Sequence, residues 1–548
     1  MKQFFLGVLF CFVFSLNSYS QHTNLLLGRN YSSDINKSLY TSKDFLHTSF
    51  KPIVRSNLSF RIDSVSENHS HNVYNTWLLR KVFSEHLIVL EGSDYRVVAS
   101  PIINFSTGKE FLDSKSTFTN SRGYLIEGDL GEKLSFSTSF VENQAVFPNY
   151  LDSYIRDNRV VPGQGYARDF KEKGFDYAMS AGYVTYKTNN MFTFQFGHGK
   201  NFVGDGYRSL LLSDNTFNYP YLKIQTTFWN VQYTNLYAEL MDINYFKTHM
   251  VSNWDQIGYP KKYLSSHYLS VNLTKDFNLS LFEAVVWRMN HAPGSRGFDI
   301  NYLNPIAMLR PLEFSINSPD NVLLGVNTKY VFQRSYIYGQ IVLDEFSISE
   351  LRKDDGWWAN KIGCQLGYKM FDLFNIHRLT CQAEYNYVRP YTYAHHNPQQ
   401  NYAHYNQPLA HPLGANFSEF LIMANYKWKR FEIDAKIMFA KSGADFIGDT
   451  ISYGSNIYFS TGNYANEEGL VGMSSGRPSD FGIEMYQGNV TELNYKSLNV
   501  SYILNPYTNL KINLGVSLRD FTNEDQQLKT QFVNFGLISD LFNHYYDI

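Results

Sequence analysis

The feature that most constrains this chain is an alternation of apolar and polar residues with a period of two, which continues from residue 93 to the end. In the clearest stretch, Leu510, Ile512, Leu514, Val516 and Leu518 fall on one face, and mostly polar residues lie between them. Successive side chains of a β-strand point to opposite faces of a sheet, so this pattern predicts strands that separate two environments. The chain is therefore expected to be largely β.

The connections between the predicted strands distinguish a membrane barrel from a soluble sandwich, whose strands also alternate apolar and polar residues. Strands of about nine to twelve residues suit a tilted transmembrane strand, and short turns that alternate with long polar loops are typical of outer-membrane barrels. Long loops are expected at 143–176, 200–220, 390–416 and 442–489. Short turns are predicted at Gly131–Lys133, Asn189-Asn190, Trp229-Asn230, Lys275–Asn278, Val331–Arg334, Asp372–Asn375, Lys429-Arg430 and Asn505–Asn509.

The turn count predicts the strand count. If both chain ends lie at the short-turn side, n strands have n/2 − 1 short turns, so these eight turns give 18 strands. Without the turn at Trp229-Asn230 the count is 16. An open sheet edge in lipid would leave backbone groups without hydrogen bonds, so the sheet must close. The expected fold is an all-β transmembrane antiparallel barrel of about 18 strands at 93–548, closed by a strand at 532–542.

The composition agrees with lipid exposure. Phe, Trp and Tyr make up 17% of the 548 residues, whereas mean hydropathy is only −0.32 and charged residues are 18%. Aromatic rings are expected in girdles at the two membrane interfaces. A formal net charge of −2 argues against nucleic-acid binding, which requires a basic surface.

The first 92 residues do not follow the alternation. Residues 1–20 have a basic start, an apolar segment and a small-x-small site at Ser18-Tyr19-Ser20, which is typical of a cleaved secretory signal peptide. Residues 21–92 are expected to form a small periplasmic or lumenal cap, in which Asn75–Phe83 suits an amphipathic helix. Export and a barrel together predict the outer membrane of a Gram-negative cell, with membrane lipid around the barrel.

Motifs for catalysis, metals or cofactors are lacking, so the protein is expected to be non-enzymatic with neither metal nor cofactor. Cys364 and Cys381 lie on predicted neighbouring strands, which leaves open either a disulfide or two unpaired thiols. A G-x-S-x-G match at 472–476 lies in a polar loop rather than a strand-to-helix elbow and is attributed to chance. Four histidines, His395, His396, His404 and His411, share a loop rich in Tyr, Asn and Gln, where hydrogen bonding is favoured over metal binding.

The long loops combine rings with polar side chains. Tyr and Trp faces can stack on the C–H faces of sugars, and Asn, Asp, Arg and Gln can hydrogen-bond sugar hydroxyls. Trp357-Trp358 after Asp354-Asp355 is one such patch, although a girdle pair is an equal interpretation. This loop chemistry predicts carbohydrate as the ligand class.

Two segments resemble a known family. Phe202–Asn215, which includes Gly204, Gly206 and Ser209-Leu210, resembles the G-x-G-x-x-S-L-x-L-S-x-N element of Wzi-type capsule-assembly proteins. A second segment from Asn304-Pro305 to Gly325 is similar in order. Residues 401–414 look closer to relatives in Bacteroidota, some of which are associated with gliding motility.

The resemblance implies an 18-stranded outer-membrane barrel that binds capsular or exopolysaccharide as a lectin. The alternatives are a component of a gliding or secretion machinery, held by other envelope proteins, and a passive channel. For Asp205 and Arg208, a packed ion pair that fixes an inward-folded loop is an equal interpretation. The residues expected to contact polysaccharide are Lys200, Asn201, Asp205, Tyr207, Arg208, Arg310, Glu313, Asp344, His404, Tyr405 and His411.

Overall fold

A computed structural model describes most of the chain. It covers residues 23–42, 44–58, 60, 74–243, 258–289, 297–305, 320–345, 347–448, 451–462 and 476–548. The predicted signal peptide at 1–20 and two expected site residues, Arg310 and Glu313, lie outside the described residues.

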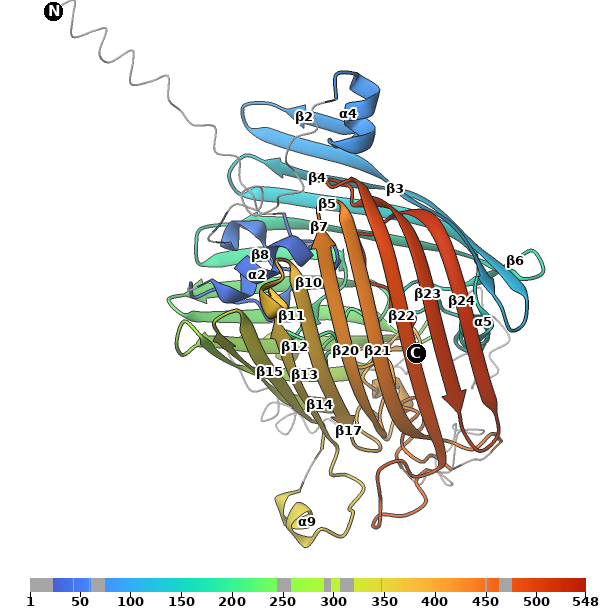
Figure 1. Cartoon of the computed structure of the whole chain (residues 1–548). Helices are drawn as coiled ribbons and strands as arrows, with labels where there is room; N and C mark the ends of the chain where they lie inside the picture. Colours follow the sequence, from blue (N-terminus) through green and yellow to red (C-terminus); the bar gives the residue numbers. More distant parts are fainter. Residues whose placement is uncertain are drawn as a thin grey trace, which may run out of the picture.

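Eighteen antiparallel strands in the described ranges close into one barrel (Figure 1). The closing pair joins the first barrel strand to the last, with Asn104–Glu110 opposite Phe532–Ile538. The predicted fold class and the count of 18 are therefore confirmed. The strands are β3 Tyr95–Glu110, β4 Lys115–Leu130, β5 Leu134–Val146, β7 Gly174–Lys187, β8 Phe192–Gly199, β10 Tyr219–Phe228, β11 Val231–Met241, β12 Lys261–Asn272, β13 Phe277–Arg288, β14 Asn321–Phe332, β15 Ser335–Leu343, β16 Ile362–Met370, β17 Leu379–Val388, β20 Phe417–Trp428, β21 Phe431–Ala444, β22 Asn489–Asn505, β23 Leu510–Thr522 and β24 Gln527–Ser539.

All eight predicted short turns connect strands at one end of the barrel, called here the short-turn end. The predicted long loops lie at the other end, the long-loop end, together with two short connections at 111–114 and 523–526. The predicted closing strand is partly wrong, because β24 ends at Ser539 and Leu541 is buried beyond it.

The outer face of the barrel is apolar, as the alternation requires. On β21, Phe431, Ile433, Ile437 and Phe439 are exposed, whereas Glu432 between them is fully buried. On β23, the predicted face of Leu514, Val516 and Leu518 is likewise exposed. Lipid-facing apolar positions and polar lumenal positions of this kind are the pattern of an outer-membrane strand.

The N-terminal segment 23–58 packs inside the barrel (Figure 1). Its helix α2, Ser33–Thr41, buries Ile35, Leu39 and Tyr40 against the wall. Its strand β1, Phe50–Lys51, pairs with β9, Phe202–Val203, which belongs to an inward-folded loop. The same segment includes the 3₁₀ turn η1, Arg55–Asn57.

The remaining short elements lie at the two ends of the barrel. The helix α4, Trp77–Phe83, agrees with the predicted helix at 75–83, and β2, Ile88–Glu91, pairs with β3. None of the described helices is long and apolar enough to cross a membrane. The others are α5 Asn149–Asn158, α9 Ile348–Lys353, η3 Ile300–Leu303, η4 Leu373–Asn375, η5 Pro398–Gln400, β6 Arg168–Phe170, β18 Ala403–His404 and β19 Gln407–Pro408.

The chain after β24 turns back into the lumen. In this C-terminal tail, residues 540–548, Tyr545 is 0% exposed and Asp547 is 1% exposed. Asn543 donates from Nδ2 to the carbonyl of Leu27 (2.7 Å), so the tail and the N-terminal segment hold each other. The lumen is thus occupied by three parts of the chain: segment 23–58, the inward-folded loops and the tail.

Candidate functional site

The loop between β8 and β10, residues 200–218, folds into the barrel because its centre is apolar. Leu210, Leu211 and Leu212 are each 0% exposed and belong to the main lumenal core. Burial of one leucine stabilises a fold by about 1.5–3 kcal/mol, so three of them can hold the loop inward. Gly204 has φ +146°, and a Cβ at Gly206 would overlap the Glu384 carboxylate, so both positions require glycine.

Asp205 lies at the bottom of this loop and is 3% exposed. Its carboxylate accepts hydrogen bonds from the hydroxyls of Thr48 (2.9 Å) and Ser49 (2.6 Å), and lies 4.0 Å from the Lys329 ammonium. Burial alone would raise the pKa of Asp205, but Lys329, Lys51 and the two hydroxyls outweigh it and hold the pKa below its ordinary value. Asp205 therefore fastens the loop to the N-terminal segment.

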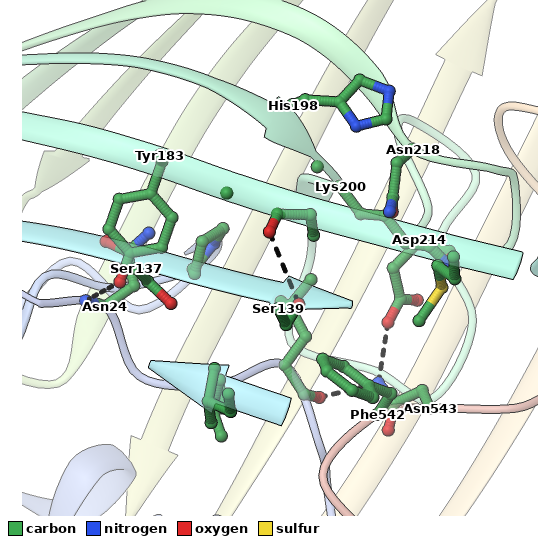
Figure 2. Close-up of a pocket in the computed structure, with 18 of the residues that line it drawn as sticks. Asn24, Ser137, Ser139, Tyr183, His198, Lys200, Asp214, Asn218, Phe542 and Asn543 are labelled. Carbon is green, nitrogen blue, oxygen red and sulfur yellow. Dashed lines mark hydrogen bonds between the residues drawn. The ribbon is translucent and has the colours of Figure 1, made fainter. Parts of the chain in front are cut away.

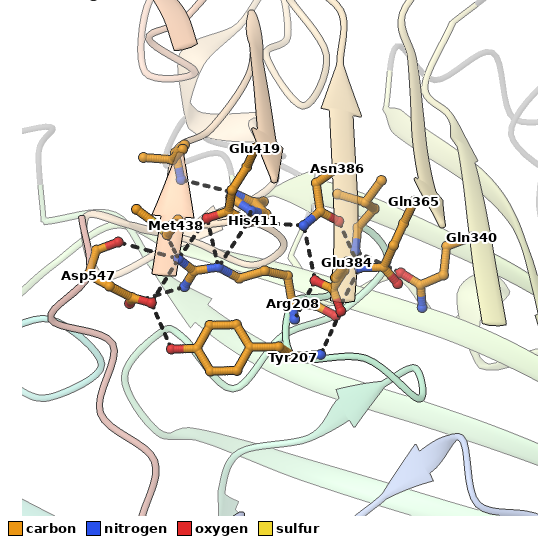
Figure 3. Close-up of polar contacts among 12 residues, drawn as sticks. Tyr207, Arg208, Gln340, Gln365, Glu384, Asn386, His411, Glu419, Met438 and Asp547 are labelled. Atoms are coloured by element: carbon orange, nitrogen blue, oxygen red, sulfur yellow. Dashed lines mark hydrogen bonds and ion pairs between the residues drawn. The ribbon is translucent and has the colours of Figure 1, made fainter. Parts of the chain in front are cut away.

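Arg208 is the centre of a fully enclosed polar cluster (Figure 3). Its guanidinium pairs with Glu419 (2.9 Å) and with Asp547 of the C-terminal tail (3.2 Å). The Glu384 carboxylate accepts from the backbone N–H groups of Tyr207 (2.7 Å) and Arg208 (3.1 Å). We call these five residues the arginine cluster.

Lys436 and His411 add further contacts to the Asp547 and Glu419 carboxylates of the arginine cluster. Asp547 accepts from the Tyr207 hydroxyl (2.8 Å) and from Lys436 (2.7 Å). Burial would raise the pKa of the Asp547 carboxyl, but Arg208 and Lys436 outweigh burial, so its pKa lies below the ordinary range. His411, 0% exposed, contacts Glu419 at 2.9 Å through Nε2. These contacts tie two loops, the strands β17, β20 and β21, and the tail into one network.

Lys200, Asn201 and Asp344 also have partners within the protein. Figure 2 shows Lys200 beside Asp214, and its ammonium donates to the carbonyls of Gly163 and Asp214. Burial lowers the pKa of Lys200 to about 8. Asn201 is 0% exposed, and the Asp344 carboxylate accepts from the Tyr393 backbone N–H (2.7 Å).

His404 supports a hairpin at the long-loop end. It is 2% exposed; its Nδ1 accepts from the Met241 backbone N–H (3.0 Å), and its Nε2 lies 3.2 Å from the Asn218 carbonyl. Burial lowers the pKa of His404 to about 3. A neutral ring that accepts at one nitrogen and donates at the other fits both contacts.

The hairpin of β18 and β19 presents Tyr405 at its tip. Tyr405 and Asn406 both have φ +56°, as the two central residues of a type I′ turn require. Such turns favour Asn, Asp and Gly, and a bulky residue at positive φ is uncommon. The chain therefore holds a tyrosine in a backbone conformation that costs free energy, and such outliers gather at functional sites.

Other rings surround Tyr405. The Phe217 ring lies 4.8 Å from it, and Tyr259 meets it edge-on at 6.1 Å, between ring centroids. Burial raises the pKa of Tyr405 to about 12; Tyr259 and Tyr166 add to this rise, and Arg168 opposes it. Tyr166 is 36% exposed and Arg168 is exposed. We call Tyr166, Phe217, Tyr259 and Tyr405 the ring cluster.

A second, smaller ring patch lies elsewhere in the long loops. The Trp357 and Trp358 centroids are 6.4 Å apart, and the Arg477 guanidinium lies 3.9 Å from the Trp358 centroid. Both tryptophans are half-buried. The predicted Trp pair is therefore an edge-to-face pair in a loop, with an arginine over one ring, rather than part of a strand.

The expected site residues thus divide into two sets. Asn201, Asp205, Tyr207, Arg208, Asp344, His404 and His411 are buried among protein partners, whereas Tyr405 reaches the surface and Lys200 is half-buried. Sequence reasoning missed Glu384, Glu419 and Asp547, and it missed Tyr166 and Arg168. The Pro162-Gly163-Gln164-Gly165 run before Tyr166, in a long loop with rings, was the available signal.

Two further expectations concern cysteine and metals. Cys364 and Cys381 lie on β16 and β17, as predicted, and both are free thiols. Within the ranges that the structure describes, no group of three or more His, Cys, Asp or Glu side chains could hold a metal ion.

The fold is similar to known barrels, although no protein-family model and no curated protein sequence matches this chain. One similar structure is Wzi from Escherichia coli, which is described as a carbohydrate-binding β-barrel of the outer membrane involved in group 1 capsule assembly. The alignment covers 94% of this chain and 98% of Wzi, with a TM-score of 0.51 and 12% sequence identity. Two Pseudomonas aeruginosa proteins also match. For OprD the alignment covers 80% of this chain and 94% of OprD, with a TM-score of 0.39 and 8% identity. For the outer membrane protein OpdK it covers 81% of this chain and 97% of OpdK, with a TM-score of 0.41 and 6% identity. The likeness to Wzi establishes an outer-membrane barrel fold and nothing finer.

Proposed function

We propose that this protein is a non-enzymatic outer-membrane barrel that binds a surface polysaccharide, capsular or exopolysaccharide, through its long-loop end. The proposal rests on one observation: the hairpin tip places Tyr405 among half-exposed rings and next to Arg168, at a backbone conformation that tyrosine does not favour. Rings stack on sugar C–H faces, and the guanidinium and phenol groups bond hydroxyls.

The fold likeness is consistent with this proposal, since the aligned Escherichia coli protein is described as carbohydrate-binding. The filled lumen favours binding over conduction, because segment 23–58, the inward-folded loops and the tail pack against one another in the described part of the barrel. The buried residues Asp205, Arg208, His404 and His411 would then act by holding loops rather than by touching sugar.

Glycan retention tests the proposal directly. A double variant, Tyr166→Ala with Tyr405→Ala, should have an affinity for the cell's own polysaccharide that is at least about tenfold lower, as expected when the main aromatic contacts of an interface are removed. The matched control is Tyr95→Ala at the short-turn end, where the tyrosine is 41% exposed, and it should bind like the unaltered protein.

The alternatives have their own outcomes. Unchanged glycan retention by the double variant would reject the ring cluster as the site. Steady conductance of the unaltered protein in a planar bilayer would favour a channel. Stable co-purification with other envelope proteins, independent of glycan, would favour a role in a gliding or secretion machinery.

A further inference from the structure

A polar cavity of about 260 Å³ lies inside the barrel near the short-turn end, away from the ring cluster. Segment 29–36, Tyr207, strands β16, β17, β20, β21 and β22, and the tail form its walls. It adjoins a smaller cavity of about 90 Å³, and the two share five lining residues: Arg29, Asn36, Lys369, Gln382 and Asn543. Arg29 and Lys369 therefore stand where the two cavities meet.

Lysines crowd this region around one ring. The ammonium groups of Lys329, Lys51 and Lys369 lie 5.1, 5.8 and 5.9 Å from the Tyr40 ring centroid. Lys329 pairs with Asp205 (4.0 Å), and Lys51 donates to the Gly204 carbonyl. Lys369 has no hydrogen bond or ion pair with any residue that the structure describes, and the Asp205 and Glu384 carboxylates act on its charge only from beyond ion-pair distance.

Arg29 adds a second cation with spare donors. Its guanidinium carbon lies 4.1 Å from the Tyr207 centroid and 4.7 Å from the Tyr545 centroid, so two rings fix its position. Nη2 donates to the Tyr207 carbonyl (3.1 Å) and the Tyr545 hydroxyl. Towards the described residues, Nε and Nη1 donate no hydrogen bond, and they are free to bind a carboxylate at the cavity.

A second wall of the cavity, formed by β20, β21 and the tail, carries acceptors. Asp434 accepts from the Asn425 amide (2.5 Å), and Asp540 is paired with Lys511 (2.6 Å). The Asn36 and Gln382 amides line the cavity on the side of Arg29 and Lys369, since both also line the smaller cavity and Gln382 is the cross-strand partner of Lys369. A bound molecule would thus meet Arg29 and Lys369 where the two cavities join, and the Asp434 and Asp540 carboxylates on the second wall, where the one cation, Lys436, is already paired with Asp547 (2.7 Å).

We propose that this cavity binds one acidic sugar unit, with its carboxylate against Lys369 and Arg29 and its hydroxyls donating to Asp434 and the amide oxygens. Inorganic phosphate would offer fewer donors to Asp434, and a neutral sugar would leave Lys369 without an ion-pair partner. A carboxylate on a ring of hydroxyls satisfies both walls. The inference does not depend on the ring cluster, because the two sites share no residue.

Calorimetric titration of the full-length protein in detergent tests the inference with glucuronate, glucose and inorganic phosphate as probes. Glucuronate should bind, and glucose and phosphate should bind at least about tenfold more weakly. Lys369→Gln should weaken glucuronate binding by about tenfold or more, because one of the two cations is lost. Lys441→Gln, a change on β21 at a residue that does not line the cavity, is the matched control and should bind glucuronate normally.

Three results would overturn the inference. They are no glucuronate binding at millimolar concentration, equal binding of glucose, and unchanged affinity of the folded Lys369→Gln variant. Phosphate binding as tight as glucuronate binding would also reject it, since the site would then be a general anion site. The difference in electrophoretic mobility between unheated and heated samples checks that each variant is folded, and Arg29→Gln provides a second cation variant should Lys369→Gln not fold.

Discussion

The arginine cluster and the ring cluster both include aromatic and charged residues of the long loops, Tyr207 and Arg208 in one and Tyr405 in the other, yet they differ in exposure. Arg208, Glu419 and Asp547 have side chains with 0% exposure, and each charge meets an opposite charge. Tyr166 and Tyr405 keep part of their rings at the surface, beside an exposed arginine. Composition alone therefore does not separate residues that hold loops from residues that can meet a ligand.

The largest expected effect comes from breaking the arginine cluster. Arg208→Met leaves Glu419 and Asp547 buried without their cation, and removal of one partner from a buried pair typically costs about 3–5 kcal/mol. Urea unfolding should therefore shift strongly, while glycan retention by the remaining folded protein stays unchanged. Normal stability with lost retention would contradict this division of roles and place Arg208 at the ligand.

Acid should destabilise the support of the ring cluster. The pKa of His404 is about 3 in the fold and about 6.5 when unfolded, so protonation favours the unfolded chain. Stability is fully present above pH 6.5 and is lost as pH falls from there towards 3, by about 2 kcal/mol at pH 5 from this histidine alone.

The control for the pH effect is His404→Gln, which keeps a donor and an acceptor but does not titrate. Its unfolding free energy should fall less between pH 7 and pH 5 than that of the unaltered protein. Parallel pH profiles for the two proteins would show that His404 is not the titrating group.

The smallest expected change in stability is at the hairpin tip. Asn is favoured in type I′ turns, so Tyr405→Asn should alter stability by less than about 1 kcal/mol, because relief of the backbone offsets lost ring packing. Polysaccharide retention should nevertheless fall. A marked loss of stability would mean that Tyr405 serves mainly to pack against Phe217.

The sequence predicted the wall of the barrel well and its contents poorly. Each strand produces an alternating apolar and polar pattern in the local sequence, because alternate residues face lipid and lumen, and each short turn interrupts that pattern. No such local pattern identifies the partners of Arg208, because Glu419 and Asp547 are 211 and 339 residues away in the sequence. No local period signals that a tail after β24 returns to the lumen.

The candidate site shows the same limit. The resemblance at 202–215 identified the segment that folds into the barrel and packs in its lumen. It could not indicate that Tyr207 and Arg208 are buried against other protein groups. Tyr405 was predicted in the loop with His404, whereas Tyr166 and Arg168 join it from a segment more than 200 residues earlier, through folding alone.

The closing seam has a consequence for how the molecule forms. β3 and β24 are the last pair that must meet, and the segment 23–58 precedes one of them while the tail directly follows the other. Asn543 bonds to Leu27, and Leu541 of the tail and Leu26 of the N-terminal segment join Ile102 of β3 in one apolar cluster, so the two ends of the chain fill the interior beside the seam that they close. Closure of the wall and filling of the lumen are therefore expected to occur as a single cooperative step, with no empty closed barrel along the way.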